Sequence, residues 1–433
     1  MNLEGADRRK IGLAAITLFI LIQGTFSQSV LQGHVISNDN QKPLPAASVY
    51  LNNTSIGTTT NDKGFFILRN IPADQFKLVV SSIGYETYTL TIDPRKSISE
   101  LNIRLKPQTE QLSSVVAVPE DPDGWKHWGS IFTQLFIGGT PNSMQTHLQN
   151  PEVLKFRKNP DNSLTAYARQ PLIVVNYALG YQLTYKLEEF EYDFNTKLVI
   201  YNGYVLFKDL GKDHPKQALK YEAERKNTYE GSLLHFMRTF FINKLDTSGF
   251  EMHSLGLVYN TEKERAKLLF RLHRDSVIVD TIGIEVEDPL FPDGKPKPYV
   301  RKTYKIADST AYFKEKLAEP DSLISHQLIK ADSVGFAADS LTAGFYFKDS
   351  LEVSYKLKGL PNKYKALTRQ HKHETYPVSQ FVFFHQKPVY VSSNGYYFGP
   401  DDLKITGYWA WSETIATLLP YDYKPGPAAP GPN

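Results

Sequence analysis

The 433-residue chain contains no cysteine and carries almost no excess charge. Without cysteine it cannot form a disulfide, a thiolate zinc site, a cysteine nucleophile or a lipid-modified cysteine. Its 49 Lys and Arg side chains nearly balance its 46 Asp and Glu side chains, which leaves a net charge of +3. This balance argues against nucleic-acid binding, because contact with a phosphate backbone needs a basic stripe or face.

Long apolar runs are also missing beyond the N-terminus. The one apolar run, residues 11–22, follows the basic residues at 8–10 and precedes small residues at Thr25 and Ser27. This is the pattern of a secretory signal peptide. A retained anchor is the alternative, but a spanning helix needs about 20 apolar residues. We therefore expect residues 1–27 to be a signal peptide, with no transmembrane span after cleavage. The mature chain is expected to be exported, either periplasmic or associated with the outer membrane or cell surface.

The composition is that of an ordinary globular protein. Apolar residues make up 41% and charged residues 22% of the chain, and 433 residues predict two or three domains. Tyrosine and phenylalanine are abundant, with 26 and 25 copies. Aromatic residues fit pleated surfaces, which favours β structure.

Residues 28–107 alternate between apolar and polar positions in about seven short runs separated by turn residues. In the last run, Leu101, Ile103 and Leu105 point one way and the polar residues between them point the other. The stretch 57–72 predicts a hairpin that turns at Gly64. This spacing is typical of a small β-sandwich.

The same segment resembles the carboxypeptidase regulatory-like domain, a transthyretin-like β-sandwich. The matching residues are Gly33, Val35, Pro43, Leu44, Pro45, Ala47, Val49, Gly57, Thr60, Asp62, Gly64, Phe66, Gly84 and Tyr85. The resemblance implies an accessory domain without catalytic zinc, of the kind that precedes outer-membrane receptors or other secreted modules in Gram-negative envelopes. An envelope or outer-membrane protein is therefore a candidate partner. The chain is too short for a plugged receptor barrel after this domain.

The remainder predicts a larger α+β region, so the expected fold class is a β-rich α+β multidomain protein. We expect a linker at 108–124, an α+β domain at 125–290, a β-rich region at 291–420 and a disordered Pro/Gly tail at 421–433. Helical spacing predicts a helix from Trp125 that ends before Gly138 and Gly139, a helix around 229–245 and a last helix at 411–419. Strands are expected to dominate from 250 to 290. Phrases such as "PLIVVNYALGYQLTYKL" and "GYWAWSETIATLLPYDY" resemble uncharacterised secreted proteins, a resemblance that implies no activity.

Two patterns of Ser and His residues are candidate sites. Ser232 and His235 lie three residues apart, a spacing that a nucleophile and its base can have, but no nucleophile elbow surrounds them. We therefore expect Ser232 to lie at the N-terminus of a helix and His235 to lie on a face of that helix. His371 and His373, which Glu374 follows, would share one face of a strand, and His385 is the candidate third zinc ligand. Their surroundings are cationic, so no metal site is assigned.

The four tryptophans form two close pairs, Trp125 with Trp128 and Trp409 with Trp411. Aromatic platforms can stack on sugars, which makes a glycan a candidate ligand. Burial in a core explains the same residues.

Asp-Ser or Asp-Thr followed by an apolar residue or Thr recurs seven times in the second half of the chain. The motifs begin at Asp275, Asp280, Asp308, Asp321, Asp332, Asp339 and Asp349. Such pairs make turns and helix caps. They also resemble acceptor motifs of a general O-glycosylation system of some Gram-negative envelopes. Mass spectrometry of native peptides carrying Ser309, Ser333 and Ser340 tests that hypothesis, which unmodified peptides would contradict.

The preferred functional prediction is a non-catalytic envelope protein with a binding or assembly role, in which the sandwich is a docking or spacer module. No catalytic, cofactor-binding or metal residue is assigned, and no cofactor is implied. The alternative is a secreted hydrolase acting on glycans or peptides, with a site in residues 120–290. Its candidate carboxylates are Glu188, Glu189, Glu191 and Asp193, although three of these would share one solvated strand face.

Overall fold

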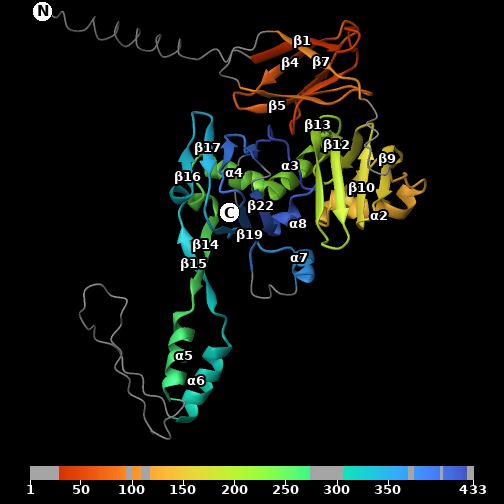
Figure 1. The fold of residues 1–433 in the computed structure, drawn as a ribbon. Helices are drawn as coiled ribbons and strands as arrows, with labels where there is room; N and C mark the ends of the chain where they lie inside the picture. Colours follow the sequence, from red (N-terminus) through yellow and green to blue (C-terminus); the bar gives the residue numbers. More distant parts are fainter. Residues whose placement is uncertain are drawn as a thin grey trace, which may run out of the picture.

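The computed structural model of the chain describes residues 29–93, 100–108, 118–273, 306–368, 375–399 and 403–426. The expected signal peptide, 1–27, lies outside the described residues. An N-terminal sandwich sits on a larger body, which comprises the described residues from 118 to 426 (Figure 1). The sandwich strands are β1 (Ser29–Ser37), β2 (Ser48–Leu51), β3 (Gly57–Thr59), β4 (Phe65–Ile71), β5 (Phe76–Ser81), β6 (Tyr88–Ile92) and β7 (Leu101–Leu105). They form sheets of order β4-β1-β7 and β3-β2-β5-β6. This confirms the seven-stranded sandwich.

The turn at residues 61–64 carries the chain from one sheet to the other. The side-chain oxygen of Asn61 accepts hydrogen bonds from the backbone N–H groups of Lys63 (2.9 Å) and Phe65 (3.0 Å), and Gly64 adopts a φ of 70° that favours glycine. Beyond the turn, Phe66 and Leu68 are buried in the core. The hairpin prediction is nevertheless wrong, because β3 pairs with β2 and β4 pairs with β1. Alternation in the sequence does not reveal which sheet receives a three-residue strand.

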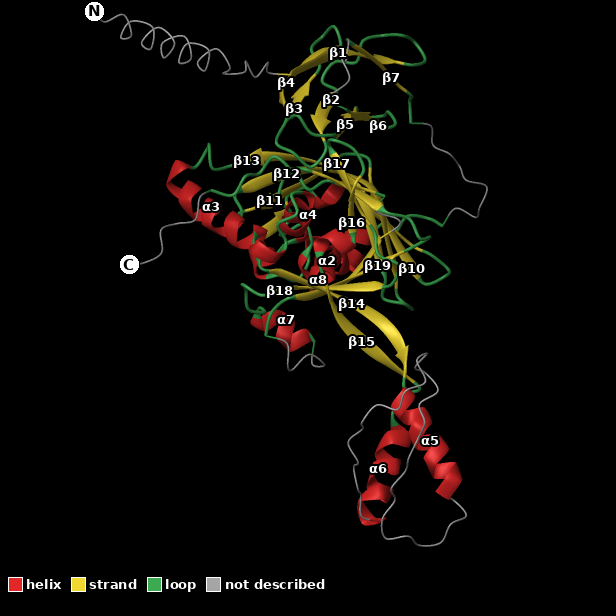
Figure 2. Ribbon diagram, turned by 90° about the vertical axis from the view of Figure 1, so that its left-hand side faces the viewer, coloured by secondary structure: helices red, strands yellow, loops and turns green. Residues whose placement is uncertain are grey.

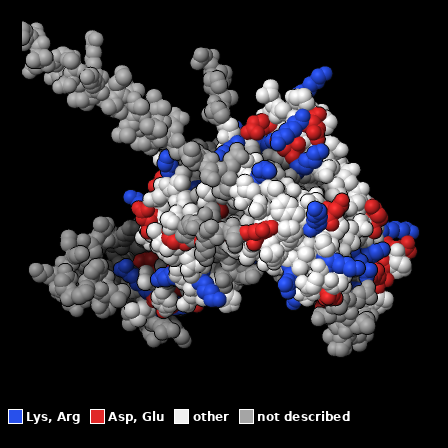
Figure 3. All heavy atoms as spheres, turned by 90° about the horizontal axis from the view of Figure 1, so that it is seen from above, with Lys and Arg blue, Asp and Glu red and all other residues white. Residues whose placement is uncertain are grey.

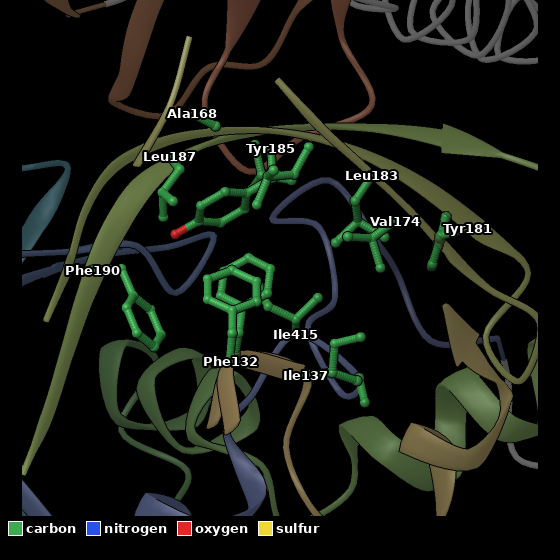
Figure 4. Packing of buried hydrophobic residues seen from close by; sticks show 14 of the residues in the cluster. Phe132, Ile137, Ala168, Val174, Tyr181, Leu183, Tyr185, Leu187, Phe190 and Ile415 are labelled. Carbon is green, nitrogen blue, oxygen red and sulfur yellow. The ribbon is translucent and has the colours of Figure 1, made fainter. Parts of the chain in front are cut away.

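The body contains a first sheet whose order is β8-β11-β12-β10-β9, with β13 paired along the other edge of β12. Its strands are β8 (Thr146–Leu148), β9 (Leu154–Lys158), β10 (Ser163–Ala168), β11 (Leu172–Asn176), β12 (Tyr181–Asp193) and β13 (Val199–Asp209). Helix α2 (Gly124–Ile137) packs against the sheet and ends at Gly138, as the sequence predicts. The ring of Phe132 lies 4.7 Å from that of Phe190 on β12, in the core shown in Figure 4.

Two further sheets form the second half of the body. Their orders are β15-β14-β18-β19-β22 and β16-β17-β20-β21. The strands are β14 (Phe250–Tyr259), β15 (Ser322–Ile329), β16 (Gly335–Ala337), β17 (Thr342–Phe345), β18 (Ser350–Tyr355), β19 (Val378–Phe383), β20 (Val389–Ser392), β21 (Tyr397–Phe398) and β22 (Leu403–Gly407). Because β14 pairs with both β15 and β18, the boundary expected at residue 290 does not separate two sheets. The change between sheets comes instead between β13 and β14.

Helix α4 (Leu233–Phe241) supplies the core of the second half. Ser232 caps it, and its buried face carries Phe236 and Phe240. The ring of Phe236 lies 5.4 Å from Phe381 and 5.3 Å from Trp409. The helical spacing of these aromatic residues is visible in the sequence. In the fold their rings contact segments that lie far from α4 along the chain.

The sequence patterns do not predict four further helices of the described chain. They are α3 (Pro215–Tyr229), α5 (Thr261–His273), α6 (Ile306–Ala318) and α7 (Asn362–Leu367). Helices α5 and α6 pair beyond the end of the β14–β15 ribbon and project from the body (Figure 2). The expectation that strands dominate from 250 to 290 is wrong at α5. Short 3-10 turns lie at Pro141–Gln145, Pro151–Val153, Asp246–Ser248 and Ala331–Ser333. In the described parts of the chain no helix has the length and apolarity needed to cross a membrane.

The C-terminal segment, residues 412–426, returns across the body. Only α8 (Tyr408–Ser412) is helical, so the helix expected at 411–419 ends early. The tail expected to be disordered from 421 is described as far as 426, where Arg238 donates to the carbonyls of Tyr421 (3.0 Å) and Tyr423 (2.9 Å). Its two tyrosines pack before the Pro/Gly repeats begin, which composition alone could not show. Residues 427–433 lie outside the described residues.

The sandwich is joined to the body at the loop 52–55. Asn53 donates its backbone N–H to Val205 on β13 (2.8 Å) and its carbonyl accepts from Tyr421 (2.7 Å). The Thr54 carbonyl accepts from Phe207 (2.9 Å). These backbone bonds fix the sandwich to both the first sheet and the C-terminal segment.

Arg225 holds α3 against the first sheet. Its guanidinium donates to Asp209 (2.7 and 3.2 Å) and to the carbonyls of Leu179 (2.7 Å) and Gly180 (3.0 Å), and it lies 3.8 Å from the ring centre of Tyr181. Burial alone would raise the pKa of Asp209, but hydrogen bonds from Arg225 and Gly211 outweigh it and lower that pKa.

Replacing Arg225 with Lys should lower the free energy of unfolding by about 2–3 kcal/mol, because lysine cannot reproduce the forked hydrogen bonds. Urea unfolding measures the loss, with R265K at an exposed arginine of α5 as the control. A carboxyl group whose pKa is lowered by folding stabilises the fold at pH values above its pKa in the unfolded chain. The difference in unfolding free energy between wild type and R225K should therefore shrink as the pH falls through the lowered pKa of Asp209. Equal losses in R225K and R265K would contradict this role.

Candidate functional site

A cavity of about 540 Å³ opens between α3, the loop that follows α2 and the segment around α8. Both halves of the body and the C-terminal segment contribute to its wall. Its lining includes Thr140, Lys220, Ala223, Glu224, Glu230, Lys358, Tyr408, Trp411, Ser412 and Glu413. Its size falls within the range of about 300–1,000 Å³ that is usual for small-molecule sites.

The turn into α8 places two aromatic rings at the cavity. Gly407 adopts a φ of 76° and ends β22, and the short helix begins at once. Trp409 is buried in the second half, where its indole nitrogen donates to the carbonyl of Gly231 (2.9 Å). Its neighbours Tyr408 and Trp411 therefore face another direction and line the cavity.

Three polar atoms on cavity-lining residues are buried and have no hydrogen-bond partner among the described residues. They are Thr140 Oγ1, Trp411 Nε1 and Ser412 Oγ. Leaving a buried polar group unpaired costs about 1–3 kcal/mol, so such groups are uncommon in folded proteins. The residues that carry these atoms all line the cavity, although the atoms themselves have almost no solvent-accessible surface.

Glu413 is a titratable group of this cavity whose pKa is strongly shifted. Burial raises its pKa to about 7, although the hydrogen bond that Oε1 accepts from the Leu233 N–H (2.9 Å) acts in the opposite direction. At neutral pH the side chain is therefore divided between carboxyl and carboxylate. Perturbed groups of this kind in a cavity mark candidate functional sites.

Lys358 faces the same cavity. Burial lowers its pKa, while Glu224 and Glu230 act to raise it. Its ammonium group donates to the carbonyl of Asn227 (2.5 Å). This cation is thus already engaged by α3 and its neighbouring carboxylates.

A second hollow of about 520 Å³ lies between Gln75 of the sandwich and the exposed rings of Phe336 and Tyr390. None of its described lining residues carries a buried polar atom without a partner. It is therefore a weaker candidate than the cavity beside α8.

Ser232 and His235 have structural roles. Ser232 Oγ accepts from the backbone N–H of His235 (3.1 Å) and so caps α4. The His235 ring lies 4.7 Å from Tyr229 and 5.0 Å from Phe250, and burial together with Arg238 lowers its pKa to about 4. The hydroxyl and the imidazole are therefore not arranged as a nucleophile and its base.

The candidate metal-binding residues His371, His373 and Glu374 lie outside the described residues. His385 is exposed in the turn after β19 with a φ of 54°. Among the residues the structure describes, no group of three or more His, Asp or Glu side chains could hold a metal ion.

The two tryptophan pairs do not form one platform. Trp125 is 38% exposed on α2, and Trp128 donates to Asp121 (2.8 Å). Trp409 is in a core, and Trp411 alone of the four lines the cavity. A sequence pattern could not separate Trp409 from Trp411, because a two-residue offset on a five-residue helix decides which faces the core.

The acidic cluster of β12 lies away from the cavity. Glu188 accepts from Thr87 of the sandwich (2.8 Å), Glu189 accepts from Asn202 (2.6 Å), and Asp193 accepts from the N–H of Asn195 (2.7 Å). Glu191 is exposed. These contacts serve domain docking, strand pairing and a turn.

Several Asp-Ser motifs occupy exposed turns. Ser322, Ser333 and Ser340 are exposed, and Ser350 is half-buried. Asp339 accepts from the N–H groups of Leu341 (2.7 Å) and Thr342 (2.9 Å), which is ordinary turn chemistry. Ser309 lies in α6, and the motifs at Asp275 and Asp280 lie outside the described residues.

Comparison with known proteins assigns the first domain. The family model described as a CarboxypepD_reg-like domain matches residues 31–117. The sandwich is similar to carboxypeptidase regulatory-like domains. That match covers less than half of the chain and leaves the body unassigned, and no curated protein matches the chain.

Among solved structures, a protein of unknown function from Bacteroides fragilis NCTC 9343, described as membrane-associated, aligns over 87% of this chain and 94% of its own. The identity is 9% and the TM-score is 0.15, which is too low to support an inference about fold or function.

Replacing Glu413 with Gln should change how stability depends on pH. The folded pKa of about 7 exceeds the ordinary 4.5, so between these values the folded chain binds more protons than the unfolded chain. As the pH rises from 4.5 to 7, the unfolding free energy of the wild type should therefore fall by on the order of 2 kcal/mol more than that of E413Q. The amide oxygen of the Gln side chain can still accept the hydrogen bond from Leu233. Urea unfolding across a pH series measures the difference, with E262Q on an exposed face of α5 as the control. Identical pH profiles for wild type and E413Q would contradict the raised pKa.

Proposed function

We propose that this chain is a non-catalytic, exported envelope protein that binds a ligand in the cavity beside α8. The observation that carries the proposal is a cavity of about 540 Å³ whose wall brings together the aromatic side chains of Tyr408 and Trp411 and the carboxyl group of Glu413. Glu413 adds a side chain that can donate or accept a hydrogen bond near neutral pH.

The sandwich is proposed to act as a docking module held in one orientation. Backbone hydrogen bonds from the loop 52–55 and the bond from Ser55 N–H to Asp422 (3.0 Å) support this role, because they attach the sandwich at several points. A spacer on a flexible tether would need no such contacts. An envelope or outer-membrane protein is the proposed partner of its free surface.

Export is proposed from the basic and apolar pattern of residues 8–22, with small residues before position 28. The proposed location is the periplasm or the outer membrane and cell surface. Nucleic acid is not proposed as a partner, and on the face seen in Figure 3 acidic and basic side chains are interspersed. Sequencing the N-terminus of the native protein tests this part, and an uncleaved Met1 would contradict it.

Blocking the mouth of the cavity should abolish binding. Ala223 is an exposed residue of α3 that lines the cavity, so A223W narrows the opening. A thermal-shift screen of the chain from Gln28 against sugars, amino acids, short peptides and fatty acids should find compounds that raise the melting temperature of the wild type. Their effect should disappear in A223W and persist in A410W, at an exposed alanine of α8 outside the lining. Compounds that still stabilise A223W would place binding elsewhere.

A hydrolase remains the second candidate, because a carboxyl group with a pKa of about 7 in a cavity is suited to general acid catalysis. Glu413 lies outside residues 120–290, the range in which the sequence predicts the alternative hydrolase site. Under the binding proposal, wild type and E413Q should both leave oligosaccharides and peptides intact, as followed by mass spectrometry. Turnover by wild type that falls about 100-fold or more in E413Q would favour the hydrolase instead.

A further inference from the structure

We infer that two copies of this chain associate through strand β15, which would join their two five-stranded sheets into one antiparallel sheet. Strand β15 is an outer strand of its sheet, whose order is β15-β14-β18-β19-β22. One edge of β15 pairs with β14 in an unbroken register from Ser322 to Ile329. No strand that the structure describes pairs with the other edge. This inference does not depend on the cavity beside α8 or on its ligand.

The outer edge of β15 offers backbone hydrogen bonds. In an antiparallel ladder, alternate residues direct their N–H and C=O groups away from the paired strand. Such an edge is a template for another chain, and proteins protect it by short length, charged residues, proline or bulges. The eight residues of β15 include no Pro, Asp, Glu, Lys or Arg. By contrast, the edge strand β9 carries Lys155, Arg157 and Lys158.

The order of residues in β15 fits a second copy of the same strand. Two identical antiparallel strands are related by a two-fold axis perpendicular to their sheet, so one residue lies opposite its own copy. With His326 on this axis, apolar positions oppose apolar positions and polar positions oppose polar positions. The opposed pairs are Ser322 with Lys330, Leu323 with Ile329, Ile324 with Leu328, and Ser325 with Gln327.

The neighbouring two-fold registers lose this match. With Ser325 on the axis, Ser322 would oppose Leu328 of the second copy. With Gln327 on the axis, Ile324 would oppose Lys330. Because opposed side chains and the faces they occupy set the register of paired strands, the register centred on His326 is preferred.

The residues near the proposed axis are accessible. Ile329 packs against the core of the second half, so its neighbour Leu328 points to the outer face of the sheet. Leu328 is 64% exposed there, and the side chain of His326 is 53% exposed. The Nδ1 atom of His326 lies 3.9 Å from Oε1 of Glu352, so a carboxylate accompanies each imidazole at the axis.

The charges beside β15 are complementary in this arrangement. Antiparallel pairing brings Lys330 of one copy to the end of the strand that follows Asp321 in the other, and both residues are exposed. Asp321 is also ion-paired with Lys263 (2.9 Å) and Lys267 (3.1 Å) of its own copy. Asp332 is exposed two residues beyond Lys330. Each end therefore carries both signs of charge, and the pairing brings together no two ends of like charge.

Sedimentation velocity measures this association. The chain from Gln28 should shift from monomer toward dimer with a Kd on the order of 10 μM, because one pair of strands makes a small interface. L328K places a charge opposite an apolar position and should weaken the association about tenfold or more. L219K is the control, at a leucine of α3 that is 86% exposed, and it should leave the association unchanged. Thermal melting should show both variants folded, since both leucines lie on the surface.

Single cysteines test the register, because the chain has no cysteine of its own. Opposed residues of antiparallel strands have Cβ atoms about 4.5–5.5 Å apart, close to the separation that a disulfide spans. H326C should therefore form a covalent dimer under mild oxidation, whereas L219C should remain largely monomeric. S322C and K330C should each form little dimer alone, but they should crosslink with each other when mixed.

The outcomes decide between a second copy and other occupants of the edge. A chain that stays monomeric at about 200 μM, and that H326C does not trap, would leave the edge to a strand of another protein and would overturn the inference. Equal crosslinking of H326C and L219C would show random collision and would also overturn it. Self-crosslinking of S322C would show parallel pairing instead. A dimer that L328K leaves intact would place the contact elsewhere, and both of these results contradict the inference.

Discussion

The loop at residues 52–55 is where the sandwich, the first sheet and the C-terminal segment meet. Asn53 donates to Val205 and accepts from Tyr421, so one residue completes backbone hydrogen bonds on two other parts of the molecule. Buried backbone groups must be paired, and these bonds pair the buried groups of the loop with the first sheet and with the C-terminal segment. Arg238 extends the connection to the second half, because it donates to Tyr421, Tyr423 and the carbonyl of Asn394 beside β20.

The cavity depends on this junction. The C-terminal segment is held at Tyr421 and Tyr423 on one side and at Trp409 on the other, so the residues between them have little freedom. Ser412 and Glu413 lie in that fixed stretch. Polar groups that lack protein partners reduce stability, and the two aromatic cores beside the cavity offset that cost. Such a local conflict between burial and pairing is what is expected at a site that serves function.

Residue types that suggest catalysis serve the fold in several places. Ser232 caps α4, His235 fills a space between aromatic rings, and Asp193 stabilises a turn. Glu188 ties the first sheet to the sandwich. By contrast Glu413, which no motif marks, has the raised pKa and the position in a cavity. A search by residue type therefore points away from the site, while burial and hydrogen-bond pairing point toward it.

Local patterns in the sequence determined the elements whose stability is local. The alternation of residues 28–107 determined the sandwich, and the spacing of Phe132 and Phe136, followed by Gly138, determined α2 and its end. The apolar face of α4 was likewise visible as a helical repeat. These predictions succeeded because the period of a buried face and the conformational freedom of glycine act within a few residues.

Only the tertiary structure decided which sheet each strand joins and where the cavity forms. Strand β14 pairs with β15 and β18 across an insertion that contains α5 and α6, and β3 and β4 join different sheets. Thr140, Lys358 and Ser412 come from three distant parts of the sequence. Their contacts depend on long-range pairing and on the return of the C-terminal segment, and neither leaves a periodic signal along the chain. The sequence by itself therefore determined the kinds of elements and the first domain, while the packing of distant segments decided the site.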